Sequence, residues 1–321
     1  MRTIAAVDKY MNDAHRRQVE ETAARCGFAV RFFPNGDALR GHETEYEVLY
    51  GHCSTDVLKA SRNLKWFCCC YAGVEPYQDE SVFPSPDTLL TNSSGAYGIT
   101  ISEHILMVTL MLLRRMPDFQ EVVRQHGWLQ SLPMRSICGS SITMLGTGDI
   151  GTNFARRAKA LGAKTVRGVC RSRKPSDPAY DEIYTLNEMD AVLPLTDILV
   201  MALPSTKETA CLFSKERIAL LRPDALLINV GRGSTIDQDA LMDALNEGRL
   251  GGAALDVMTP EPLPADHPLW DTKNLILTTH CSGNMSLGIT CDINVNMFCE
   301  DLERYAKGEP LKHLVNRRLG Y

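Results

Sequence analysis

The chain has 321 residues, of which 44% are hydrophobic and 23% are charged, and its formal net charge is −5 at pH 7. This length is enough for two domains of ordinary size, each with its own core. A mildly acidic chain has no general attraction to nucleic acid or to an anionic membrane, so neither is expected as a partner. The eleven cysteines include the consecutive run 68–70, whose neighbours would point to opposite faces of a strand. They therefore indicate buried free thiols rather than disulfides or a zinc site, and no metal is expected.

The ends of the chain carry no targeting pattern. The N-terminal sequence MRTIAAVDKY lacks the apolar core and the cleavage site of a signal peptide. The most apolar helix candidate, residues 105–113, is too short to span a bilayer. We therefore expect a cytoplasmic protein, in keeping with the reduced cysteines.

Short apolar runs alternate with helix-length amphipathic segments in the first part of the chain. A helix is predicted over residues 12–26, ending at Gly27. Strands are predicted at 3–7, 28–33, 46–50, 65–70 and 88–91. Because strands that alternate with helices form parallel sheets covered on both faces, this block predicts one α/β domain.

A second block of strands follows a long helical stretch over residues 97–115. Six strands are predicted, at 141–145, 166–170, 198–202, 225–230, 252–257 and 275–278. After Gly283 the chain becomes helical again, over residues 287–307. The second block is therefore inserted into the first. The predicted fold class is α/β, with two doubly wound parallel-sheet domains, the inserted one Rossmann and the other flavodoxin-like.

The strand at 141–145 runs into GTGDIG, residues 146–151, and a helical pattern follows. A G-x-G-x-x-G sequence between a strand and a helix is the fingerprint of a dinucleotide-binding turn. Gly146 permits the turn, Gly148 lets the backbone approach a pyrophosphate, and Gly151 lets the helix pack close to the strand. A purely structural turn is the weaker alternative. Cofactor contacts are therefore expected from Gly146, Gly148, Asp149, Ile150 and Gly151.

The next strand ends in a cluster of positive charge, made by Arg171, Ser172, Arg173 and Lys174. In NAD-binding units an acidic residue usually stands about 20 residues past the glycines and holds the ribose hydroxyls. Here no Asp or Glu lies between Asp149 and Asp177. Because Arg and Lys can hold a 2′-phosphate, the cluster favours NADP, with NAD as the alternative cofactor and an exposed basic loop as the alternative structure.

Three later segments follow strands of the second block. They are LLINVGRGSTIDQDAL with Arg232, AALDVMTPEPLP with Asp256 and Glu261, and LILTTHCSGN with His280. Together with LGTGDIG, LPSTKET, CCCYAGVEPY and TNSSGAYGITISEH, they resemble the D-isomer-specific 2-hydroxyacid dehydrogenase family. Within the family, the basic strand end resembles that of NADPH-dependent glyoxylate/hydroxypyruvate reductases. The resemblance covers most of the chain.

The resemblance implies an oxidoreductase that reduces small 2-oxo acids to D-2-hydroxy acids by hydride transfer from NADPH. It implies that Arg232 binds the substrate, since its planar set of donors can hold a carboxylate and polarise the ketone. It implies that His280 donates the proton, because histidine changes charge near neutral pH. Glu261 would stabilise and orient that imidazolium. A surface arginine, a structural histidine and an exposed glutamate are the alternatives for these three residues.

The resemblance also implies domain roles and further contacts. Residues 1–92 and 285–321 would bind the substrate, and residues 93–284 the NADP. Substrate contacts are expected from Ala72, Gly73, Val74 and Tyr97. Further cofactor contacts are expected from Leu203, Pro204, Thr209, Val230, Gly231, Asp256 and Ser282. Tyr97 could equally pack at the start of its helix.

The helix at 97–115 matches the family's usual homodimer element. Its apolar residues Ile105, Met107, Leu110 and Leu113 could equally be ordinary core. The unusual HCSGN and VMTPEP segments leave the substrate open. A phosphoglycerate dehydrogenase is disfavoured because its long forms carry a further domain, and a formate dehydrogenase-like reaction needs no proton relay. The non-enzyme alternative is an NADP(H)-sensing interaction protein of the corepressor type.

Overall fold

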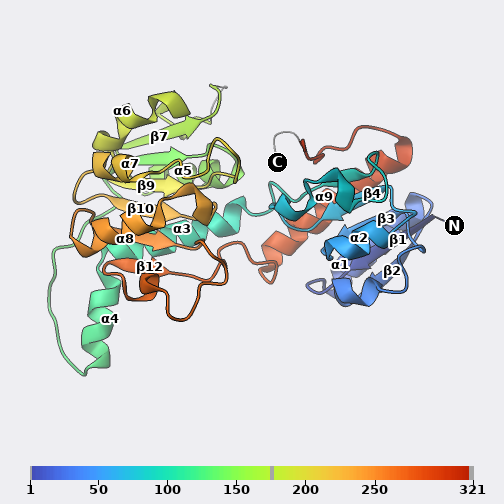
Figure 1. The fold of residues 1–321 in the computed structure, drawn as a ribbon, viewed down its shortest axis with the longest axis horizontal. Helices are drawn as coiled ribbons and strands as arrows, with labels where there is room; N and C mark the ends of the chain where they lie inside the picture. The colour runs from blue at the N-terminus through green and yellow to red at the C-terminus, as the bar shows by residue number, and fades with distance from the viewer. Residues whose placement is uncertain (1, 174–176, 318–321) are drawn as a thin grey trace. The chain divides into compact units, whose positions relative to one another are not determined.

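The computed structural model in Figure 1 describes residues 2–173 and 177–317. The chain divides into two compact units, Met1–Tyr97 with Asn284–Tyr321, and Gly98–Gly283. Each unit is built on one sheet in which all the named strands pair in parallel. The predicted class, two α/β domains with parallel sheets, is confirmed.

The first unit has a five-stranded sheet in the order β2-β1-β3-β4-β5, which is the flavodoxin-like order. Its strands are β1 (Arg2–Val7), β2 (Phe28–Phe33), β3 (Val48–Gly51), β4 (Trp66–Cys69) and β5 (Leu89–Thr91). Its helices are α1 (Asp13–Arg25), α2 (Thr55–Ala60) and α9 (Gly288–Lys307). Helices α1 and α9 pack against each other, and Phe298 of α9 stacks on Tyr50 of β3 with ring centroids 4.1 Å apart. The C-terminal helix thereby completes the core of the N-terminal sheet.

Local sequence signals account for the limits of α1. The Asn12 side chain accepts a hydrogen bond from the His15 N–H at 2.9 Å, so it satisfies one of the free donors of the first turn. After the C-cap, Gly27 has φ +78°, a conformation that glycine adopts without strain. The helix therefore begins and ends within one residue of the predicted limits, because the predicted end residues Asn12 and Cys26 are its caps.

The second unit has a seven-stranded sheet in the order β12-β11-β10-β9-β6-β7-β8. Its strands are β6 (Ser141–Leu145), β7 (Thr165–Cys170), β8 (Glu182–Thr185), β9 (Ile198–Met201), β10 (Leu226–Asn229), β11 (Gly252–Leu255) and β12 (Leu275–Leu277). Its helices are α3 (Gly98–Leu113), α4 (Met116–Arg124), α5 (Asp149–Ala160), α6 (Met189–Val192), α7 (Lys215–Leu220) and α8 (Gln238–Asn246). The strand order reverses between β6 and β9, and ligands of such sheets bind at the carboxyl ends of the strands beside this point.

Two elements of this unit differ from the prediction. One strand that the sequence did not predict, β8, pairs with β7 at the edge of the sheet, and none of its residues is fully buried. An edge strand needs no apolar run, so the sequence gives little sign of it. Helix α4 also has no counterpart in the prediction. It is separated from α3 by Arg115, whose φ of 56° breaks the helical path, and Pro117 stands in its first turn.

Among the described residues, no helix has both the length and the apolar character needed to cross a membrane.

Candidate active site

The glycine turn has the geometry of a phosphate-binding loop. It joins β6 to α5, with Gly148 as the N-cap. A Cβ at Gly146 would lie 2.6 Å from the Ala202 carbonyl oxygen, and one at Gly151 would lie 2.1 Å from the Gly146 oxygen. A Cβ at Gly148 would meet nothing within 4 Å. The loop is therefore tight toward the protein and open at Gly148, next to the free N–H groups of the helix start, which fits a pyrophosphate.

Asp149 and Ile150 follow in the first turn of α5. The Asp149 carboxylate accepts hydrogen bonds from the Gly98 N–H and, at 2.9 Å, from the Asn153 side chain. A Cβ at Gly98 would lie 2.3 Å from Asp149 Oδ1, so the start of α3 approaches this carboxylate as only glycine can. The Asp149 side chain thus joins α3 to α5 and leaves its backbone for a ligand. Ile150 is half-buried.

The basic cluster stands at the end of β7, where Arg171, Ser172 and Arg173 are exposed, and Lys174 lies outside the described residues. Arg173 Nη2 donates to Glu188 Oε1 at 2.6 Å. Hydrogen bonds from the Thr185 N–H and from Arg173 lower the pKa of Glu188 to about 2. The charge of Arg171 contributes to lowering the pKa of Glu208, after the stronger effects of the Glu208 backbone and of Thr206. A carboxylate is therefore already bonded to Arg173, and another lies near Arg171.

The loop after β9 packs against the start of the loop after β10. Thr209 Oγ1 donates to the Pro204 carbonyl oxygen at 2.6 Å, and Leu203 and Thr209 are buried. A Cβ at Gly231 would lie 2.7 Å from the Leu203 oxygen, and Val230 is also buried. These residues therefore form one closely packed layer beside the glycine turn.

The backbone of Arg232 is fixed by the side chains of Asn229 and Thr235. Its carbonyl oxygen accepts from Asn229 Nδ2 at 2.9 Å and from Thr235 Oγ1 at 2.7 Å. Its half-buried side chain donates from Nη1 to the Gly231 oxygen at 2.7 Å. A Cβ at Gly233 would lie 2.2 Å from the Met258 carbonyl oxygen. The Arg232 loop is therefore pressed onto the loop that carries Glu261.

Glu261 and His280 form an ion pair across the loops that follow β11 and β12. His280 Nδ1 lies 2.7 Å from Glu261 Oε2, and Glu261 Oε1 accepts from the Met258 N–H at 2.9 Å. Because a carboxylate can only accept, Nδ1 carries the hydrogen and Nε2 is the nitrogen left for proton exchange. The His280 side chain is half-exposed, so a ligand can reach it.

Asp256 contacts His280 through its carbonyl oxygen, which accepts from the His280 N–H at 2.8 Å, and the residue is 2% exposed. Its Oδ1 accepts from Thr278 Oγ1 at 2.6 Å and from the Cys281 N–H at 2.9 Å, and its Oδ2 accepts from the Ser282 N–H at 3.1 Å. Burial alone would raise its pKa, but the hydrogen bonds from Ser282, Thr278 and Cys281 outweigh burial and lower it. Asp256 is therefore a buried carboxylate whose oxygens hold the loop after β12, and the buried Ser282 belongs to that loop.

The expected substrate loop belongs to the first unit. It follows β4, with Ala72 and Gly73 half-buried and Val74 buried. The Ala72 oxygen accepts from Asn92 Nδ2 at 2.7 Å. Tyr97 is 5% exposed, and its hydroxyl donates to the Cys70 oxygen at 2.7 Å, which corresponds to the packed alternative for this residue.

Three polar residues that contact the expected site residues or their partners were not predicted from the sequence. Asn229 and Thr235, both 1% exposed, hold the Arg232 backbone, and His104 of α3 lies 3.2 Å from Thr278 Oγ1 through its Nε2. A polar residue at the end of an apolar strand marks Asn229, and a histidine within an apolar helix marks His104. Neither signal says what the side chain contacts.

Known proteins similar to this chain belong to one enzyme family. Residues 106–282 match the family described as D-isomer specific 2-hydroxyacid dehydrogenase, NAD binding domain. Glyoxylate/hydroxypyruvate reductase A of Escherichia fergusonii is 31% identical over 299 residues, which are 91% of each chain. A D-isomer specific 2-hydroxyacid dehydrogenase family protein of Aeromonas salmonicida is 33% identical, with a TM-score of 0.86 over 98% of this chain and 99% of that one.

One further similar structure was solved with a bound dinucleotide. The NADPH-dependent glyoxylate/hydroxypyruvate reductase of Sinorhizobium meliloti, solved in complex with NADP and sulfate, is 25% identical, with a TM-score of 0.83 over 100% of both chains. The chain belongs to the D-isomer specific 2-hydroxyacid dehydrogenase family and carries its NAD-binding domain.

Proposed function

We propose that the protein reduces small 2-oxo acids of the glyoxylate/hydroxypyruvate kind to D-2-hydroxy acids with NADPH. The observation that carries the proposal is the ion pair between His280 Nδ1 and Glu261 Oε2, 2.7 Å long, on loops adjacent to that of Arg232. Relatives named as glyoxylate/hydroxypyruvate reductases support this substrate class. The cytoplasm is the proposed compartment.

The residues that would hold the cofactor fit it. The open side of Gly148 and the start of α5 would receive the pyrophosphate, and Arg171, Ser172 and Arg173 would receive the 2′-phosphate. Leu203, Pro204, Thr209, Val230 and Gly231 would line the path between them, with Asp256 and Ser282 near the nicotinamide. NADPH, when bound, supplies the hydride for the carbonyl carbon.

The proton and the substrate charge are handled by the chain itself. His280, charged and oriented by Glu261, gives a proton from Nε2 to the carbonyl oxygen in reduction and takes it back in oxidation. Arg232 binds the substrate carboxylate and polarises the ketone through a second guanidinium donor. The backbone of Ala72, Gly73 and Val74 is the proposed contribution of the substrate-binding unit (1–92 and 285–321), and residues 93–284 are the proposed cofactor-binding domain.

Measuring NADPH oxidation with glyoxylate, hydroxypyruvate and a series of larger 2-oxo acids tests this function. We expect turnover of the small acids by the native protein and a large loss in His280→Asn. His267→Asn is the matched control, because His267 lies in the same unit and only caps a short turn, a role that Asn keeps. Turnover of none of the acids would favour an NADP(H) sensor of the corepressor type.

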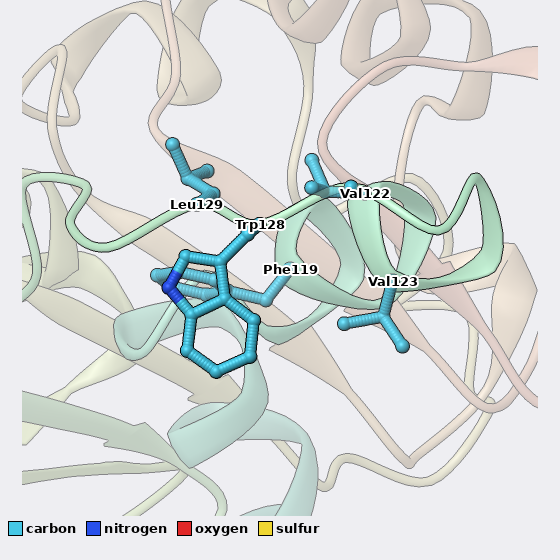
Figure 2. A pocket seen from close by; sticks show the side chains of 6 residues that line it. Phe119, Val122, Val123, Trp128 and Leu129 are labelled. Atoms are coloured by element: carbon cyan, nitrogen blue, oxygen red, sulfur yellow. The ribbon is translucent and has the colours of Figure 1, made fainter.

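We also propose that the protein is a homodimer. Of the helix residues predicted for contact, Ile105 and Leu113 are buried in the core, whereas Met107 is 48% and Leu110 40% exposed. An apolar pocket is lined by three residues of α4 and by two residues of the segment that follows it, namely Phe119, Val122, Val123, Trp128 and Leu129 (Figure 2). Trp128 is 90% exposed in a single chain. An apolar surface of this kind is typical of a subunit interface.

A further inference from the structure

His280 has a backbone conformation that its surroundings must enforce. Its φ is +54°, in the left-handed region that residues other than glycine rarely adopt. Such conformations persist where neighbouring contacts over-determine them, and they are common at functional sites. The direction of the imidazole therefore depends on whatever holds residues 280–282.

Asp256 provides that hold with its backbone and its side chain. The His280 N–H donates to the Asp256 carbonyl oxygen at 2.8 Å. The next two N–H groups, of Cys281 and Ser282, donate to Oδ1 and Oδ2 of the same residue. The turn thus wraps around one buried carboxylate, and rotating that carboxylate would displace the two residues that directly follow His280.

The orientation of this carboxylate is set from the other side by Thr278 and His104. Thr278 Oγ1 donates to Asp256 Oδ1 at 2.6 Å. A hydroxyl has a single hydrogen, so toward His104 the same oxygen can only accept, and His104 Nε2, 3.2 Å away, must carry a hydrogen. The chain of donors therefore runs in one direction, from His104 to Thr278 to Asp256.

The first member of this chain lies on a rigid element. His104 is in the middle of α3, which packs against α5, β10 and β11 of the same unit. Burial lowers the pKa of His104, and the Asp256 charge offsets this only in part. A neutral imidazole with its hydrogen on Nε2 meets the requirement of Thr278 without burying a positive charge in α3.

We propose that His104 and Thr278 are positioning residues that, through Asp256, hold the turn carrying His280 in its productive orientation. The inference rests on the proposed role of His280 as the acid. It assigns a function to two residues that would contact neither substrate nor cofactor. It deepens the proposed reaction by naming what keeps the proton donor in place.

Thr278→Val and Thr278→Ser test the proposal together. Val has nearly the same shape but lacks the hydroxyl, whereas Ser keeps it. We expect Thr278→Val to lower kcat by about 10- to 100-fold, the cost of a small misplacement of a catalytic group. The dissociation constant of NADPH and the thermal midpoint should change little. Thr278→Ser should restore kcat to within a few-fold of the native value.

His104 is tested in the same way. Gln can place an N–H donor near the position of Nε2, and Leu cannot. His104→Gln should therefore keep most of kcat, and His104→Leu should lose about as much as Thr278→Val. The double change of His104→Leu with Thr278→Val should lose little more than either alone, because both break one chain. Full additivity of the two losses would overturn the proposal.

Imidazole NMR spectra of the protein without substrate separate this proposal from the proposed function. His280→Asn and His104→Asn identify the two rings. We expect Thr278→Val to shift or broaden the His280 signals and Thr278→Ser to leave them in place. If the native protein reduces no 2-oxo acid, the proposed function fails and these spectra still decide the positioning. Unchanged His280 signals together with an unchanged kcat in Thr278→Val would refute the positioning role. An equal loss of stability in Thr278→Val and Thr278→Ser would refute it as well.

Discussion

The proposed preference for NADPH depends on arginines that already have carboxylates as neighbours. The Arg173 side chain is 60% exposed and already bonded to Glu188, whose side chain is 42% exposed. Arg171 lies close enough to Glu208 to affect its titration. At Arg173 a 2′-phosphate must therefore replace or share the Glu188 carboxylate. The double change Arg171→Ala, Arg173→Ala removes both proposed contacts.

The expected preference follows from the exposure of these side chains. An exposed charge pair contributes up to about 1 kcal/mol, which is a factor of about five in a dissociation constant. Two unopposed contacts would therefore set an upper limit of roughly 30-fold on the preference for NADPH over NADH. Arg173→Ala alone should cost only about threefold, because the phosphate first has to displace Glu188.

Removing the charge of the competing Glu188 carboxylate should have the opposite effect on NADPH affinity. Glu188→Gln keeps an acceptor for the Thr185 N–H, as glutamine does in capping boxes, but removes the charge that holds Arg173. NADPH should then bind a few-fold more tightly, while NADH binding stays the same. A loss of NADPH affinity in Glu188→Gln would mean that Glu188 orients Arg173 for the phosphate and does not compete with it.

The assay is a fluorescence titration of NADPH and NADH against each variant, followed by steady-state kinetics with both cofactors. Arg249→Ala is the matched control, since Arg249 also pairs with a glutamate at 2.6 Å in the same unit. Raising the salt concentration should narrow the native preference, because exposed pairs are screened. A native protein that binds NADH as tightly as NADPH at low salt, or a double variant that keeps its preference, would refute the assignment of the cluster.

The other predictions concern the reaction and the assembly. Arg232→Lys should raise KM for the oxo acid and lower kcat with little change in NADPH affinity, because one ammonium cannot replace two planar donors; unchanged kinetics would remove Arg232 from the site. His280→Ala should reduce kcat about 10²- to 10⁴-fold, the usual contribution of general acid catalysis. Glu261→Gln should move the pH profile of reduction toward acid, since the imidazolium loses its anion; a profile that stays in place would show that the pair is not part of the chemistry. Trp128→Ser should shift light-scattering mass toward the monomer, and a native protein that is already monomeric would contradict the proposed interface.

The sequence alone predicts most of the fold because apolar runs and glycines act locally. The strands at 28–33 and 141–145 agree with the structure to the residue, since each is an apolar run bounded by a turn or a loop. The edge strand Glu182–Thr185 escapes prediction because it is not fully buried and carries no such run. Arg115 likewise divides two helices by its left-handed backbone, which no residue type announces.

The candidate site also has features that the sequence predicts and features that it does not. The glycine order at 146–151 and the strand-end positions of Arg232 and His280 follow from the sequence, because a tight turn and a parallel sheet restrict which residues stand there. The partners of these residues do not follow from it. The bond from Arg173 to Glu188, and the chain from His104 through Thr278 to Asp256, join residues separated by 15 to 174 positions. Only the tertiary packing of β7 beside β8, and of α3 against β11, brings these polar groups within hydrogen-bond distance.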